Sequence, residues 1–188
     1  RIIPLTRIMI ENEKFIEEAR KQEVALLVYG SPLIATTHIS LILKCKKEEI
    51  DYRILHNASI LDAISETGLQ VYKFGKTVSM PVWNEKYKPD SFIDIIKFNQ
   101  AINAHTLVLV DMALSYGDAL RQLVQACKGK IRLGKTVVCS KLGTEESRIY
   151  YRKIDELNGL EVYAPFCFIV PGKLHFLEEE ALKLIGKE

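Results

Sequence analysis

The sequence predicts an α/β protein with two parts, with a parallel sheet in the first part and a mixed sheet in the second. Val24–Val28 is a short apolar run closed by Gly30 and Pro32, and a helical pattern follows it. Such a run is typical of a strand that is buried on both faces. Tyr52–Leu55 repeats the order of strand, turn and helix, and consecutive units of this kind indicate a parallel sheet. With 188 residues, of which 48% are hydrophobic, the chain can fill one large core or two small ones.

The elements of the first part follow from apolar spacing and from the residues that begin and end helices. Asn57 or Ser59 can cap a helix, and Gly68 is suited to end it in the left-handed conformation. In order, we expect helix Glu11–Lys21, strand Val24–Val28, helix Ile39–Glu49, strand Tyr52–Leu55 and helix Ile60–Glu66.

The sequence pattern changes near Phe74–Lys76, which predicts a boundary between a domain of residues 1–75 and a domain of residues 76–188. Beyond it, short alternating and β-branched runs are separated by helical patterns. We expect strands at Thr77–Val82, Thr106–Val110, Thr136–Cys139 and Val162–Val170. We expect helices at Phe92–Ala104, Tyr116–Cys127, Glu146–Leu157 and Leu177–Leu184, and loops at Asn84–Ser91 and Gly143–Ser147.

Composition excludes several classes of protein. The net charge of +2 lacks the dense basic face of a nucleic-acid binder, and short charged runs such as Glu178–Glu180 are typical of solvated helix faces. No apolar run reaches the ~18 residues of a membrane span. The four cysteines are far apart and form no CxxC pair, which indicates buried thiols of a reducing compartment. We therefore expect a cytoplasmic protein with no membrane or nucleic-acid partner.

The motifs contain no catalytic group that stands out. The Gly30–Ser31–Pro32 turn has neither the GxGxxG nor the GxxxxGK[ST] spacing, so read alone it is a plain strand-to-helix turn. The histidines form no metal-binding pattern, and His38, His56 and His105 fit structural roles better than catalytic ones. The expected strand ends can bind a ligand. Because no catalytic group is visible in the motifs, the sequence favours chemistry carried by a bound cofactor.

Three segments resemble a known family. They are YGSPLIATTH at Tyr29–His38, LHNASILDAISETGLQVYKFGKT at Leu55–Thr77 and HTLVLVDM at His105–Met112, joined by IVPGKLHFLEEE at Ile169–Glu180. Together they are similar to the signatures of the diphthine synthases, which are two-domain methyltransferases of the tetrapyrrole-methylase-like class (class III). The second segment is the most specific, and the resemblance covers essentially the whole chain.

The resemblance implies an activity, a cofactor and partners. The family transfers a methyl group from S-adenosylmethionine, with S-adenosylhomocysteine as the product. The acceptor is the amino group of a 3-amino-3-carboxypropyl histidine on translation elongation factor 2, a step of diphthamide biosynthesis, and some members also form a methyl ester. The resemblance further implies a homodimer, no metal, and a cofactor cleft between the domains. The cofactor-binding positions that it carries over are Ser31, Ile34, Ser59, Ile60, Val110, Ser140 and Phe166.

The chain departs from the family pattern at three places. Ser31 stands where the family has Asp, which removes a charged acceptor for the ligand. The family's N-terminal strand, with its GLGL-type turn, is absent. The connection from Met112 to Tyr116 is much shorter than in the family, which predicts an interruption of the chain near Met112–Ser115.

Two alternatives to this function stay open at this stage. The first is a tetrapyrrole methylase of the same fold, which would bind a small soluble acceptor in place of a protein. The second is a non-catalytic ligand-binding α/β module, suggested by the loss of the acidic residue at Ser31.

Overall fold

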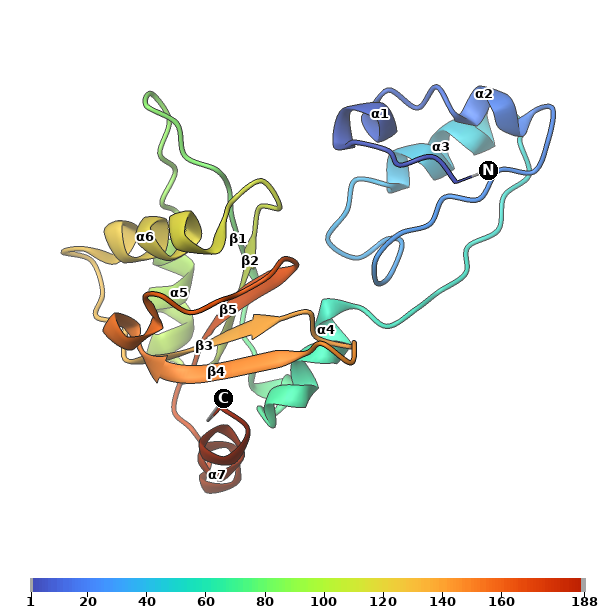
Figure 1. Cartoon of the computed structure of the whole chain (residues 1–188). Coiled ribbons are helices and arrows are strands. Elements are labelled where there is room, and N and C mark those ends of the chain that lie inside the picture. The colour runs from blue at the N-terminus through green and yellow to red at the C-terminus, as the bar shows by residue number, and fades with distance from the viewer. Residues whose placement is uncertain (1, 187–188) are drawn as a thin grey trace. The chain divides into compact units, whose positions relative to one another are not determined.

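A computed structural model describes residues 2–186 and divides between Ile60 and Leu61 into two compact units, each of which is described by itself (Figure 1). The first unit contains the short helices α1 (Arg7–Glu11) and α2 (Ile16–Ala19) and the longer helix α3 (Ile39–Lys47). Thr6 caps α1, because its hydroxyl accepts the backbone N–H of Met9. Within the predicted helix Glu11–Lys21, only Ile16–Ala19 is helical beyond the last residue of α1, as α2, so that helix is shorter than expected. The helix predicted at Ile39–Glu49 is confirmed as α3.

Ion pairs at the surface join α2 to α3 in the first unit. Arg20 donates to Glu48 at 2.9 Å, and Lys44 lies 3.6 Å from Glu17. Ile16 is the one fully buried apolar side chain within residues 2–60. The first unit therefore has little apolar core of its own.

The predicted parallel sheet of the first unit is wrong for the residues described. Val24–Val28 and Tyr52–Leu55 form no strand, and Leu27 is 79% exposed where a buried strand was expected. A strand exists only through hydrogen bonds to a neighbouring strand, and residues 2–60 contain no strand to pair with.

The second unit holds the sheet and most of the helices (Figure 1). It starts within α4 (Ile60–Ala63), which continues into the 3₁₀ helix η1 (Ile64–Thr67), and Gly68 ends this segment at a φ of 76° as predicted. The further helical elements are η2 (Val71–Lys73), α5 (Phe92–Ala101), α6 (Tyr116–Cys127), η3 (Ile154–Leu157) and α7 (Phe176–Ile185). The strands are β1 (Val78–Met80), β2 (Thr106–Val110), β3 (Lys135–Ser140), β4 (Arg148–Lys153) and β5 (Phe166–Val170).

The five strands form one mixed sheet in the order β1-β2-β5-β3-β4, which confirms the mixed sheet expected here. β1 and β2 are parallel, and the other three pairings are antiparallel. Since β5 runs opposite to both of its neighbours, β1, β2 and β3 point the same way. Their carboxyl ends therefore meet at one edge of the sheet.

Alternate residues of the strands face two different layers of helices. Val78, Val108, Val138 and Phe168 share a row and pack with α5 and α6 in the main core. The opposite face carries α7, whose end bonds to β4 through the backbone N–H of Tyr151. This alternation is what a sheet covered on both faces requires.

Three further expectations for this region are wrong. The segment predicted as helix Glu146–Leu157 contains β4 and η3, because Arg148–Lys153 pairs antiparallel with β3 along its whole length. The strand predicted at Val162–Val170 begins only at Phe166, after a cis bond before Pro165. The chain is continuous near Met112–Ser115, where the N–H of Leu114 bonds to the carbonyl of Asp111 in a tight turn.

The segment of residues 61–75 belongs to the second unit and packs against the rest of it. A Cβ built on Gly68 would lie 2.4 Å from the Cβ of Ala181 in α7, so only glycine fits this approach. Phe74 also bridges to His105 in parallel fashion, next to the start of β2. The division of the structure after Ile60 rests on such packing, and the predicted domain boundary between residues 75 and 76 stays a prediction.

Candidate functional site

Three of the predicted site residues lie together at the edge where β1, β2 and β3 end. Ser140 pairs with Phe166 across β3 and β5. Leu109 pairs with Cys167, so Val110, the next residue of β2, comes opposite Phe166. Val110, Phe166 and Ser140 therefore form one row over three neighbouring strands and face the same side of the sheet.

Hydrogen bonds hold the chain before Phe166 against the end of β3. The Ser140 hydroxyl donates to the carbonyl oxygen of Tyr163 at 2.7 Å. The backbone N–H of Lys141 donates to the carbonyl oxygen of Pro165 at 2.8 Å. Ser140 is buried, while Val110 and Phe166 are half-buried, so two apolar side chains keep open surface at the strand ends.

Lys141 directly follows this row in an uncommon backbone conformation. Its φ is 51°, the left-handed region that few residues other than glycine adopt. Its ammonium group pairs with Glu146 and lies 5.5 Å from the ring centre of Tyr163. The end of β3 is thus fixed by contacts from three directions, namely the backbone, an ion pair and a ring.

The other four predicted site residues belong to the first unit or to its boundary. Gly30 has a φ of 82°, and a Cβ built on it would lie 3.6 Å from the carbonyl oxygen of Ala58. The turn that carries Ser31 therefore lies beside the loop that carries Ser59, and both serines are buried. Ile34, from the same turn, is 39% exposed, and Ile60, at the start of α4, is half-buried.

One carbonyl group organises the turn after Gly30. The carbonyl oxygen of Pro32 accepts the Thr36 hydroxyl at 3.2 Å and lies 2.8 Å from the His38 ring nitrogen Nδ1. A carbonyl oxygen can only accept, so Nδ1 carries the hydrogen. Thr36 and His38 thus have structural roles here, which agrees with the structural role expected for His38.

The chemistry of these residues fits an adenosyl cofactor. Half-buried Val110 and Phe166 offer apolar surface to an aromatic base, and serine hydroxyls supply hydrogen bonds in both halves of the set. None of the seven side chains is charged, so none of them replaces the acidic group that the family has at position 31. Within residues 2–186, no cluster of three or more His, Cys, Asp and Glu side chains could hold a metal ion.

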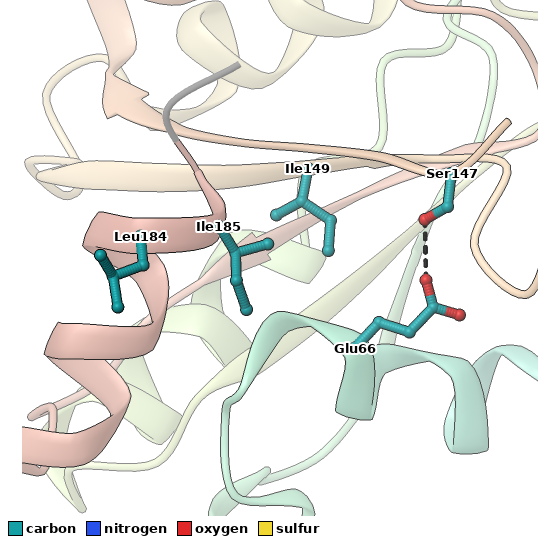
Figure 2. A pocket seen from close by; sticks show the side chains of 5 residues that line it. All are labelled: Glu66, Ser147, Ile149, Leu184 and Ile185. Carbon is teal, nitrogen blue, oxygen red and sulfur yellow. Dashed lines mark hydrogen bonds between the residues drawn. The ribbon is translucent and has the colours of Figure 1, made fainter. Parts of the chain in front are cut away.

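A separate cavity of about 350 Å³ lies beside the end of α7 (Figure 2). Apolar side chains of Ile149, Leu184 and Ile185 line it, and Glu66 accepts the Ser147 hydroxyl at 2.7 Å. The other carboxylate oxygen of Glu66 accepts a backbone N–H at 2.7 Å. Because both oxygens are engaged within the protein and no predicted site residue lines this cavity, we assign it no part in cofactor binding.

The structure also contains a buried polar network that the sequence did not indicate. Glu178, expected on a solvated helix face, is fully buried and lies 3.0 Å from Nε2 of His105. The N–H of Gly172 donates to Nδ1 of the same ring, so Nε2 is the protonated nitrogen. This network lies at the amino end of β2, away from the row at the carboxyl ends, and its role is structural.

Comparisons with known proteins agree with this fold. The family model of the tetrapyrrole (corrin/porphyrin) methylases matches residues 6–158. A diphthine synthase of Methanococcus maripaludis is 37% identical over 191 residues, covering 95% of this chain and 75% of that protein. A diphthine synthase of Methanocaldococcus jannaschii is 36% identical over 188 residues, with 92% and 72% covered.

A solved structure described as diphthine synthase superposes with a TM-score of 0.82 at 30% identity, and the match covers 98% of this chain and 75% of that one. The fold is therefore that of the tetrapyrrole-methylase class. Within that class, the chain belongs to the diphthine synthase family, as the resemblance of its signature segments predicted. Among residues 2–186, no helix combines the length and the apolar character needed to span a bilayer.

Proposed function

We propose that the protein is an S-adenosylmethionine-dependent methyltransferase of diphthamide biosynthesis, which methylates the amino group of the 3-amino-3-carboxypropyl histidine of elongation factor 2. The observation that carries this proposal is the 37% identity to a diphthine synthase over 95% of the chain. The row of Val110, Phe166 and Ser140 at one sheet edge supports it, because this edge is where α/β sheets place ligands.

We assign cofactor binding to the positions that the resemblance carries over, which are Ser31, Ile34, Ser59, Ile60, Val110, Ser140 and Phe166. Apolar faces would contact the adenine, while hydroxyl and backbone groups would bind its polar edges. The serine at position 31 would accept hydrogen bonds without adding a charge.

The proposed reaction explains why no catalytic side chain stands out. When bound, S-adenosylmethionine supplies a methyl group on a positively charged sulfur. The protein must hold a neutral amine in line with that group and exclude water. An α-amino group has a pKa of about 8, so a useful fraction of it is neutral at pH 7. No residue of this chain needs to act as a nucleophile.

The proposal also covers assembly and location. We propose a homodimer in the cytoplasm, with elongation factor 2 as the protein partner and with no role for nucleic acid or membrane. A stable dimer should bury well above ~1,000 Å². Light scattering at micromolar concentration should give twice the mass of one chain. A monomer would contradict the proposed dimer but not the proposed methyltransferase activity.

Titration calorimetry with S-adenosylhomocysteine tests the cofactor site. Ile60→Arg should abolish binding, because it fills the site and places a cation there without a partner. Ile8→Arg, on an exposed position of α1, is the matched control and should bind like wild type. Ser31→Asp should bind equally well or more tightly. Wild-type affinity in Ile60→Arg would place the cofactor elsewhere.

A further inference from the structure

We propose that Tyr116 is a positioning residue for the cofactor, because its ring fixes the orientation of the Phe166 ring at the site. The inference rests on the proposed cofactor site, in which Phe166 contacts the ligand. Tyr116 itself lies behind Phe166, in the first turn of α6, and is absent from the segments that resemble the family.

The aromatic contacts of Phe166 come from two sides. The Tyr116 ring lies 5.8 Å from it at an interplanar angle of 83°, and the Phe168 ring lies 6.1 Å from it at 79°. Both are edge-to-face arrangements, the geometry that the charge distribution of aromatic rings favours. Phe166 is half-buried and packs against the main core, and these two rings contact it in oriented pairs that define its plane.

Tyr116 is itself held firmly. Its hydroxyl donates to the carbonyl oxygen of Leu157 at 2.9 Å, and its side chain is buried. Burial raises the pKa of this hydroxyl to about 12, so it remains a donor throughout the physiological range. Ser115 caps α6 through the N–H of Asp118 and fixes the backbone from which the ring projects. The ring is therefore anchored at both ends.

A double-mutant cycle on the full chain tests this role, with the dissociation constant for S-adenosylhomocysteine as the readout. Phe166→Leu and Tyr116→Leu should each weaken binding by about threefold to tenfold, the range expected for loss of one oriented ring pair. The double variant should bind no more weakly than Phe166→Leu alone, because Tyr116 acts only through Phe166. Tyr116→Phe keeps the ring pair and loses only the hydroxyl that anchors the ring, so it should lose less affinity than Tyr116→Leu.

Controls separate positioning from simple destabilisation. Leu123→Ala removes a buried side chain of the same helix and should lower the melting temperature while leaving the dissociation constant unchanged. If Tyr116→Leu does not fold, Tyr116→Met takes its place in the cycle. Wild-type affinity in the Tyr116 variant, or additive losses in the double variant, would overturn the inference. Wild-type affinity in Phe166→Leu would instead overturn the proposed cofactor site.

Discussion

Glu178 is a fully buried carboxylate that takes part in a hydrogen-bond network of the second unit. Its carboxylate accepts backbone N–H groups of Gln70 at 2.9 Å and His175 at 2.7 Å, besides the His105 ring and the Lys73 ammonium group. Burial alone would raise its pKa, but these hydrogen bonds and the ion pair lower the pKa to about 2. A fully buried carboxylate with this many partners links η2, β2 and α7.

Replacing Glu178 should therefore destabilise the protein strongly. Glu178→Gln leaves Lys73 without its ion-pair partner and loses acceptors, which should cost roughly 3 kcal/mol in the free energy of unfolding. Glu179→Gln is the matched control, because its side chain is half exposed and, among the residues described, its ion pair is with Lys183 at the surface. Urea unfolding measures both, and the control should change by less than about 0.5 kcal/mol. Equal effects would contradict the structural role of the network.

The same network predicts how stability depends on pH. Burial lowers the pKa of His105 below its ordinary 6.5, although Glu178 opposes this. Below about pH 6.5 the His105 ring therefore binds a proton in the unfolded chain but stays neutral in the folded chain. The free energy of unfolding consequently falls as the pH falls. The low pKa of Glu178 adds a further loss only below about pH 4.5, its ordinary value.

His105→Gln tests the first part of this pH dependence. Glutamine can supply one donor and one acceptor as the neutral ring does, but it does not titrate. Between about pH 7.5 and 5.5 the melting temperature of wild type should fall more steeply than that of the variant. Parallel curves would show that His105 does not titrate differently in the folded and unfolded chains.

At the scale of elements, the least expected feature is the unpaired segment Val24–Val28. Its composition is that of a buried strand, yet no neighbouring strand within residues 2–60 satisfies its backbone. Hydrogen exchange followed by mass spectrometry should show rapid exchange there and slow exchange in Thr106–Val110, whose N–H groups bond within the sheet. Equal protection of the two segments from exchange would contradict this account and would support the strand predicted at Val24–Val28.

The contrast between these elements shows what the sequence could predict. β2 and α6 have the bounds expected of them, because a β-branched run ended by Asp111 and a helix capped by Ser115 are local signals. β4 was missed, because the apolar residues of 146–157 fit helical spacing as well as strand alternation. Only pairing with β3, a contact outside the local window, decides between the two.

The predicted cofactor-binding residues also depend on contacts that local sequence signals do not determine. Val110, Ser140 and Phe166 came from resemblance to a family, and their alignment in one row depends on the registers of β2, β5 and β3. Spacing along the chain does not determine such registers. Tyr116 was missed because its role comes from contacts with Phe166 and Leu157, although an aromatic residue directly after a helix cap was a visible signal.

At the scale of the whole molecule, the two units differ in how they are stabilised. The second unit has a mixed sheet with helices on both faces, whereas the first relies on surface ion pairs such as Arg20–Glu48. Surface pairs contribute little, about 0–1 kcal/mol each.

The binding of S-adenosylhomocysteine can be tested through stability. A ligand bound only by the folded protein stabilises it by mass action. Raising the S-adenosylhomocysteine concentration should therefore raise the melting temperature of wild type and leave that of Ile60→Arg unchanged.

Methyl transfer itself is the central claim, and mass spectrometry of the acceptor tests it most directly. Elongation factor 2 carrying the 3-amino-3-carboxypropyl histidine is incubated with the protein and S-adenosylmethionine, with Ile60→Arg as the matched control. We expect the peptide containing that histidine to gain the mass of one or more methyl groups with wild type and none with the variant. An unmodified peptide in the presence of folded, cofactor-binding wild type would contradict the proposed function.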